Sequence, residues 1–203
     1  MKIICIGRNY RDHAKEMHAD VPEVPVFFIK PDNCLLRNNQ PFFYPDFTSD
    51  LQYELEVVLR INRLGRSIKQ KFAHRYYDAI TLGIDFTARD LQRECKAKGL
   101  PWEISKAFDY SAPIGTFIPK DELGDLNGLN FRLELNGKVV QQGNTANMIF
   151  GYDELISYVS RFITFRTGDL LFTGTPSGVG PVNVGDRLQA YLNDRLMLDF
   201  FIK

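Results

Sequence analysis

Three carboxylates in this sequence have the spacing and surroundings of metal ligands. Glu54 and Glu56 stand two residues apart in the apolar segment YELEVVL, residues 53–59. A β-strand alternates its faces, so both carboxylates share a face, with Cα atoms about 6.6 Å apart at about 3.3 Å per residue. Side chains at that separation can converge on one cation. A solvent-facing strand surface carries the same pattern, so the pair alone leaves both interpretations open.

Asp85 favours the metal interpretation. It stands in the otherwise apolar segment LGIDFT, residues 82–87, where an unpaired carboxylate is costly to bury and needs a cation or hydrogen-bond donors. Asp85 could instead cap the helix that follows, but Thr87 is better placed for that role, with Asp90 three residues later as in a capping box. Three carboxylates with no neighbouring Cys or His pair form an all-oxygen set, which suits Mg²⁺ or Mn²⁺ rather than zinc.

Two further pairs have helical spacing. His13 and Glu16 are three residues apart on a predicted helix, where the carboxylate can orient the imidazole and raise its basicity. Arg89 and Gln92 have the same spacing on the helix after Asp85, so both can reach the volume beside it. Each pair is also compatible with an ordinary exposed helix face.

The loop at residues 174–180 is rich in glycine but lacks the Lys-Ser/Thr ending of a phosphate-binding loop. No strand–GxGxxG–helix unit occurs either, so we expect neither ATP nor NAD as a ligand. Small residues at Gly174 and Thr175 could bring backbone N–H groups and a hydroxyl close to a substrate carboxylate. The same residues would also suit a tight turn between strands.

The elements that must position these residues are mainly strands. Asn9 is expected to cap the first helix, and Asn136-Gly137 favours a two-residue hairpin turn. The last helix is expected to turn Leu155, Ile156, Val159 and Phe162 inward. We expect strands over residues 3–6, 26–29, 53–60, 81–86, 129–135, 138–142, 169–173, 187–192 and 197–202, and helices over 10–17, 72–80, 88–98 and 152–162.

This content predicts an α+β fold that is mainly β, a roll or sandwich with peripheral helices, rather than a doubly wound parallel sheet. The chain has 203 residues and shows neither a repeat nor a low-complexity linker, so residues 1–203 are expected to form one domain.

Composition restricts the partners. Basic and acidic residues number 25 each, so there is no basic field for nucleic acid or an anionic membrane, and we expect neither as a partner. The apolar run at residues 3–5 is short for a signal peptide, and no run of about 18 apolar residues occurs, so a cytoplasmic protein is expected. Cys5, Cys34 and Cys95 lack CxxC spacing and are expected to be reduced packing residues.

Several segments, taken together and in order, resemble the fumarylacetoacetate hydrolase family. The similarity runs from about residue 3 to residue 202 and favours the short single-domain branch of acylpyruvases and oxaloacetate decarboxylases. The segments are GRNY at 7–10 with DH at 12–13, FIKP at 28–31, ELE at 54–56, DFTARD at 85–90, KGLPW at 98–102 and TGTPSGVG at 173–180.

The resemblance implies a β-roll core, a homodimer, and a site for a small 2-oxo acid. It implies that Glu54, Glu56 and Asp85 ligate Mg²⁺, for which Mn²⁺ commonly substitutes. By resemblance His13 and Glu16 are a water-activating dyad, and Lys106 stabilises developing enolate charge near the metal-bound oxygens.

The remaining implied roles concern the substrate. By resemblance Arg89 supports the site, Gln92 orients the substrate carboxylate, and the loop containing Gly174 and Thr175 approaches that carboxylate. From the sequence alone, a lysine such as Lys106 that follows a loop is more often a solvated surface residue.

The function expected from these residues is metal-dependent hydrolysis of the C–C bond of short 3-acylpyruvates, of the acetylpyruvate or fumarylpyruvate type. It proceeds through a metal-stabilised pyruvate enolate, and oxaloacetate decarboxylation is a second activity. Two alternatives stay open within the family: 2-hydroxyhepta-2,4-diene-1,7-dioate isomerase and oxaloacetate tautomerase. A non-enzymatic β module whose acidic face holds a structural cation is a third.

Overall fold

The computed structural model describes all of residues 1–203. The strands are β1 (Lys2–Gly7), β2 (Val26–Pro31), β3 (Leu35–Leu36), β4 (Leu51–Tyr53), β5 (Leu55–Ile61), β6 (Tyr77–Ile84), β7 (Thr87–Ala88), β8 (Ala112–Pro113), β9 (Ile118–Pro119), β10 (Asn130–Leu135), β11 (Lys138–Asn144), β12 (Leu170–Phe172), β13 (Gly180–Pro181), β14 (Arg187–Leu192) and β15 (Arg195–Phe201). The α-helices are α1 (Arg11–Glu16), α2 (Gln70–Ala73), α3 (Arg89–Lys98), α4 (Glu103–Lys106) and α5 (Tyr152–Ser160). Four 3₁₀ helices are η1 (Asp32–Cys34), η2 (Lys120–Glu122), η3 (Leu126–Gly128) and η4 (Thr145–Asn147).

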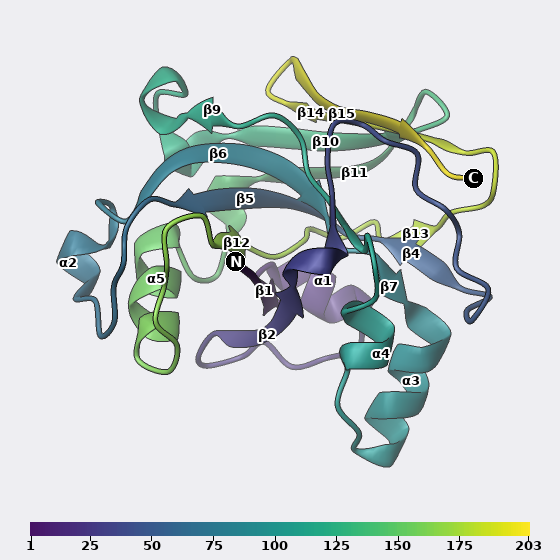
Figure 1. The fold of residues 1–203 in the computed structure, drawn as a ribbon, viewed down its shortest axis with the longest axis horizontal. Coiled ribbons are helices and arrows are strands. Elements are labelled where there is room, and N and C mark those ends of the chain that lie inside the picture. Colours follow the sequence, from purple (N-terminus) through teal and green to yellow (C-terminus); the bar gives the residue numbers. More distant parts are fainter.

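Two larger sheets form the centre of the molecule (Figure 1). The first has the order β2-β1-β12-β5-β6-β9, with only β1 and β12 parallel, and the second is the antiparallel sheet β11-β10-β14-β15. Leu55, Val57 and Leu59 of β5 share one buried cluster with Leu133 of β10 and Leu188 of β14, so the core lies between these sheets. The prediction of a mainly β, α+β fold is confirmed, and its mixed sheet fits the expected sandwich roll.

The register of β5 against β6 brings the carboxylates together. Leu55 pairs with Ile84 and Glu56 with Gly83, and the backbone N–H of Asp85 donates to the carbonyl of Glu54 over 2.8 Å. Residues directly opposite on antiparallel strands share a face, so Glu54, Glu56 and Asp85 all lie on one side of this pair. In Figure 1 this end of the two strands lies near α1, α3 and α4.

Gly83 is required opposite Glu56. A Cβ atom at this position would lie 2.7 Å from the ring of Phe172 and 2.9 Å from Val58, closer than real contacts allow. The missing side chain lets the sheet close tightly behind the carboxylates.

Asn9 ties three distant segments together. Its side-chain amide donates to the carbonyls of Phe150 at 3.0 Å and Thr173 at 2.8 Å, and its oxygen accepts from the N–H of Phe150 at 2.8 Å. The N-cap position of α1 is occupied by Tyr10, so the expected capping role of Asn9 is wrong. A fully buried amide that satisfies three buried backbone groups fixes the start of α1 against the loop after β12.

Other expectations also need correction. The helix expected over 72–80 is only α2, because Tyr77 already begins the buried strand β6 and the apolar run there serves β-pairing. Thr87 does not cap α3, since its hydroxyl donates to the Asp85 carbonyl and the N-cap position is Ala88. Helix α5 ends at Ser160, which leaves Phe162 half exposed rather than inward-facing.

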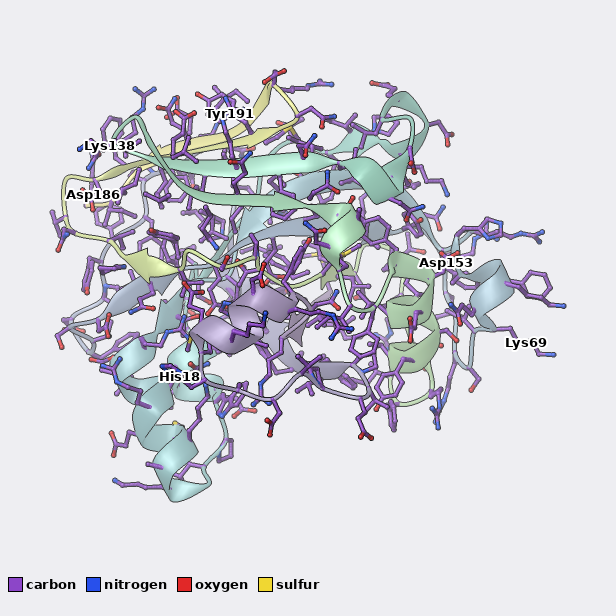
Figure 2. The ribbon with its side chains drawn as sticks, turned by 180° about the vertical axis from the view of Figure 1, so that it is seen from behind. His18, Lys69, Lys138, Asp153, Asp186 and Tyr191 are labelled. Carbon is purple, nitrogen blue, oxygen red and sulfur yellow. The ribbon has the colours of Figure 1, made fainter.

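The other predicted helices and the hairpin are confirmed to within a few residues. Asn136 and Gly137 form the turn between β10 and β11, and Asn136 donates to Asp186 at 2.7 Å. Figure 2 shows Lys138 and Asp186 together at this end of the four-stranded sheet. All three cysteines are free and buried, as expected. No helix is long and apolar enough to cross a membrane.

Replacing Asn9 by Ala should lower the free energy of unfolding by at least about 2 kcal/mol, because it strands buried backbone groups of Phe150 and Thr173 without partners. Urea denaturation measures this change. The matched control is Asn127→Ala, an exposed position whose side chain makes no hydrogen bond. Equal stability of the two variants would contradict the assigned role of Asn9.

Candidate active site

The three predicted ligands converge. One oxygen from each of Glu54, Glu56 and Asp85 lies within 4.8 Å of the others, and the three residues are 6%, 1% and 1% exposed. The solvated-strand interpretation of the two glutamates is therefore wrong. Burial without compensation would strongly disfavour three adjacent negative charges, so the surroundings must supply positive charge or protons.

Lys106 and Arg89 supply part of that charge. The Lys106 Nζ atom lies 2.8 Å from Glu54 Oε2 and 2.8 Å from Asp85 Oδ2, and Arg89 Nη2 lies 2.5 Å from Glu54 Oε1. Burial opposes ionisation of Glu54, but Lys106 and Arg89 outweigh it and hold the pKa of that carboxyl well below its usual range. Glu54 is therefore a carboxylate at neutral pH.

Lys30 is a third buried cation, and sequence reasoning assigned it no role. Its side chain is fully buried, and Nζ lies 2.6 Å from Asp85 Oδ1. The ammonium donates to the carbonyls of Phe86 and Ser111 and to the Ser111 hydroxyl, at 3.2, 2.9 and 3.0 Å. The only sequence signal was a lysine in the apolar strand VFFIKP, which cannot be buried without such partners.

Glu56 has no cationic partner. Its Oε2 atom accepts a hydrogen bond from the Gly174 N–H at 2.7 Å. Burial, followed by the negative charge of Asp85, raises the pKa of Glu56 well above its usual range. This carboxyl therefore holds a proton more firmly than an ordinary glutamate unless a further cation lies beside it.

The arrangement fits a divalent cation. Asp85 Oδ1 is buried and forms an ion pair with Lys30 at 2.6 Å, but it accepts no hydrogen bond, whereas the Lys30 ammonium donates to the oxygens of Phe86 and Ser111. A buried carboxylate oxygen without a donor, beside a carboxyl that lacks a counter-charge, is what a hard cation with oxygen ligands would satisfy. Glu54, Glu56 and Asp85 would hold such an ion.

The predicted dyad is present in the same region. His13 Nδ1 lies 3.1 Å from Glu16 Oε2, and Glu16 Oε1 accepts from the Gly178 N–H at 2.9 Å. His13 is only 6% exposed, because α1 lays it against the interior, whereas Glu16 lies at the surface. His18, two residues beyond α1, is exposed and takes no part (Figure 2).

A cavity of about 50 Å³ joins the carboxylates to the dyad. It exceeds the space that one ordered water needs, about 10–15 Å³, and its polar walls supply partners for water. The lining includes all predicted site residues except Glu16 and Gly174, together with Arg8, Lys96, Phe28 and Trp102.

Two residues predicted to contact the substrate, Gly174 and Gln92, form hydrogen bonds to other protein groups in this structure. The Gly174 N–H is directed at Glu56, and Gly174 adopts a φ of +99°, where a Cβ would lie 2.6 Å from that of Asn9. Gln92 lines the cavity, but its amide oxygen accepts from Arg89 Nη1 at 2.7 Å. Thr175 also lines the cavity and accepts a hydrogen bond from Gln141.

Gln141 is a second residue that sequence reasoning missed. Its amide nitrogen donates to the Thr175 hydroxyl at 2.9 Å and the Pro176 carbonyl at 3.0 Å, while its oxygen accepts from the Leu55 N–H at 2.9 Å. It therefore anchors the glycine-rich loop to the start of β5. A glutamine inside a strand of alternating polarity gave no signal for this.

Fold and site together define a β-sandwich protein with a buried cluster of three carboxylates that could hold a metal ion. The model of the family "Fumarylacetoacetate (FAA) hydrolase C-terminal" matches residues 2–198. The chain belongs to the fumarylacetoacetate hydrolase family, as the sequence segments indicated.

Named relatives cover nearly the whole chain. It is 40% identical over 201 residues to the mitochondrial oxaloacetate tautomerase of Bos taurus, covering 99% of this chain and 91% of the relative. It is 45% identical over 185 residues to the mitochondrial oxaloacetate decarboxylase of Dictyostelium discoideum, covering 91% and 85%. The crystal structure of fumarylpyruvate hydrolase from Pseudomonas aeruginosa in complex with Mn²⁺ and pyruvate superposes with a TM-score of 0.95 at 37% identity, covering 100% and 89%.

Replacing Lys30 by Met should lower the free energy of unfolding by about 3 kcal/mol, because it removes the buried cation paired with Asp85 and the donor to the oxygens of Ser111. Urea denaturation in EDTA measures it, and Lys98→Met, which removes an exposed lysine paired with Glu94, should leave the free energy of unfolding unchanged. Adding Asp85→Asn should recover part of the loss. A Lys30→Met protein as stable as the wild type would refute the pairing.

Metal should stabilise the protein increasingly as pH rises. Because the pKa of Glu56 is raised, metal-free protein loses stability through this group as pH rises from the ordinary glutamate pKa of about 4.3 toward the folded value. Mg²⁺ reverses this, since it binds the ionised form and displaces the proton.

The measurement is thermal unfolding at pH 5.5 and pH 8, in EDTA and in Mg²⁺, for wild type, Glu56→Gln and Glu122→Gln. Glu122 is exposed and unpaired, so its variant should follow the wild type. Glu56→Gln should lose both the Mg²⁺ response and the pH trend relative to wild type. A Mg²⁺ response that survives in Glu56→Gln would remove Glu56 from the ligand set.

Proposed function

We propose that this protein is a divalent-metal-dependent hydrolase that cleaves the C–C bond of short 3-acylpyruvates. The observation that carries the proposal is the position of the His13–Glu16 pair, whose imidazole lines the same cavity as the three carboxylates. Decarboxylation and tautomerisation do not require an activated water, so a dyad placed here favours hydrolysis. Mg²⁺ is the proposed ion, and Mn²⁺ is supported by the complex of the related fumarylpyruvate hydrolase.

The bound ion would act as a Lewis acid that polarises the 2-oxo carbonyl of the substrate. The ammonium of Lys106 lies at the carboxylates, where it can stabilise negative charge that develops on the substrate oxygen. The amide nitrogen of Gln92 donates no hydrogen bond within the protein, so it can donate to the substrate carboxylate. Arg89 keeps Gln92 and Glu54 in place.

His13 and Glu16 would activate the attacking water molecule. A neutral imidazole that donates from Nδ1 to Glu16 must accept at Nε2, which makes Nε2 the base for a water molecule in the cavity. The water oxygen bonds to the distal carbonyl carbon, its proton passes to His13, and the bond from that carbon to the pyruvate methylene breaks. The released enolate takes up a proton on carbon, giving pyruvate and a carboxylic acid.

A second candidate is decarboxylation or tautomerisation of oxaloacetate. It is favoured by the two mitochondrial relatives, which carry those names at 45% and 40% identity. These reactions would use the same cation and the same lysine but no attacking water. The residues that separate the two candidates are therefore His13 and Glu16.

Replacing Glu16 by Ala should reduce pyruvate release from acetylpyruvate by about 100-fold, because the His13 imidazole loses the carboxylate that orients it. The assay follows pyruvate release from acetylpyruvate and from oxaloacetate, with Mg²⁺ and with EDTA, corrected for the metal-only background. Asp12→Ala, an exposed neighbour on α1, serves as the control and should retain activity.

Wild-type release from acetylpyruvate that requires Mg²⁺ and collapses in Glu16→Ala is the result expected for a hydrolase. Release from oxaloacetate alone, unaffected by Glu16→Ala, would move the assignment to the second candidate. Release from neither substrate in Mg²⁺ would overturn hydrolysis and decarboxylation. It would leave tautomerisation, which releases no pyruvate and is followed instead as the enol–keto conversion of oxaloacetate.

A further inference from the structure

Two cations on the cavity wall have no acidic partner. Arg8, in the loop between β1 and α1, and Lys96 on α3 both line the cavity that contains the carboxylates. Arg89, Lys106 and Lys30 are each paired with a carboxylate, whereas neither Arg8 nor Lys96 makes an ion pair within the chain. Their charge is therefore available to a ligand.

The backbone holds Arg8 in an unusual conformation. Its φ is +58°, in the left-handed region that non-glycine residues rarely adopt. The three buried hydrogen bonds of the neighbouring Asn9 fix the chain there. Strain of this kind persists where the surrounding structure over-determines the position, and it is frequent at ligand sites.

The Lys96 side chain lies over the Trp102 ring in the wall of the cavity. Its Nζ atom lies 5.3 Å from the centre of the Trp102 ring, which itself lines the cavity. Partial burial, and then the positive charges of Arg89 and Arg8, lower the pKa of Lys96. Because Arg8 and Lys96 line the same cavity, both can contact one ligand group bound in it.

The balance of charge indicates what that group is. Three carboxylates face the three paired cations Lys30, Arg89 and Lys106, so this set is neutral when fully ionised. A divalent cation, Arg8 and Lys96 then make the cavity strongly positive. A monoanion such as acetylpyruvate leaves most of that charge uncompensated, and a dianion compensates more of it.

We propose that Arg8 and Lys96 bind a second, distal carboxylate of the substrate, so that the enzyme selects dicarboxylic 2-oxo acids over monocarboxylic ones. This inference rests on the proposed function and names its substrate class. The distal carboxylate accepts charge-assisted hydrogen bonds from the two side chains while the 2-oxo acid end lies at the metal ligands.

The far end of the substrate could instead bind in an apolar pocket of about 320 Å³ beside the cavity. It shares Val26, Phe28, Trp102 and Lys106 with the cavity wall and is otherwise lined mainly by apolar side chains of β2 and residues 100–102. An uncharged tail would be drawn there. The experiment must therefore compare a charged and an uncharged tail of the same shape.

Fumarylpyruvate and its but-2-enoyl analogue, in which a methyl group replaces the distal carboxylate, form such a pair. The measured quantity is the ratio of kcat/KM for the two, in Mg²⁺. Wild type should favour fumarylpyruvate by at least about tenfold, the expected size of a charge-assisted interaction of about 1.5 kcal/mol. Arg8→Asn and Lys96→Met should each reduce that ratio several-fold.

These substitutions are matched to their sites. Asn tolerates the left-handed backbone of position 8, and Met keeps the length of Lys96 and its packing on Trp102. Lys98→Met is the control, because Lys98 stands on the same helix, is exposed and pairs only with Glu94, so it should leave the ratio unchanged. Turnover of the but-2-enoyl analogue should persist in Arg8→Asn and Lys96→Met.

A wild-type ratio near one, or a preference for the but-2-enoyl analogue, overturns the inference while leaving hydrolysis intact. A ratio that Arg8→Asn and Lys96→Met leave unchanged also overturns it. If wild type cleaves neither compound, the proposed hydrolysis fails, and calorimetric titration of the two uncleaved compounds tests the inference directly. Tighter binding of fumarylpyruvate that both variants lose supports it, and equal binding overturns it.

Discussion

The constraint on which this structure depends is the burial of three carboxylates side by side. The register of β5 and β6 places Glu54, Glu56 and Asp85 on one face, within 4.8 Å of each other. Each buried charge carries a desolvation penalty of several kcal/mol, and the like charges repel one another. The fold can keep them only by bringing cations to the same point.

Those cations come from separate parts of the chain, which explains why so many elements meet at one end of the sheet. Lys30 arrives from β2, Arg89 from α3 and Lys106 from α4. Together they satisfy Glu54 and one oxygen of Asp85, but they leave Asp85 Oδ1 without a hydrogen bond and Glu56 with only the Gly174 N–H. A divalent ion would therefore coordinate Asp85 Oδ1 and supply the missing charge at Glu56. The lysine and arginine contacts to the other carboxylate oxygens hold the ligands in position before the ion binds.

Sequence patterns predicted the strands and the ligand set because both depend on local order. Alternation in residues 53–59 placed Glu54 and Glu56 on one face, and the apolar surroundings of Asp85 marked it as a carboxylate needing a partner. The roles of Lys30 and Gln141 were not predictable, because their partners Asp85, Ser111, Leu55 and Thr175 lie 34 or more residues away in the sequence. The helix expected at 72–80 failed for a related reason, since pairing of β6 with β5 overrides the local helical spacing.

The proposed chemistry divides between two separate parts of the structure. In the proposed function, a 2-oxo acid would be polarised at the three carboxylates, which lie in or beside β5 and β6, and at Lys106 of α4. In the proposed hydrolysis, water would be activated by His13 and Glu16 of α1, a helix of six residues held by the Asn9 anchor and the Glu16–Gly178 hydrogen bond. On these proposed roles, tautomerase, decarboxylase and hydrolase chemistry would all use the carboxylates and Lys106, and only hydrolysis would also use the base on α1. A substitution in α1 would then alter the reaction without disturbing the charge balance that keeps the carboxylates buried.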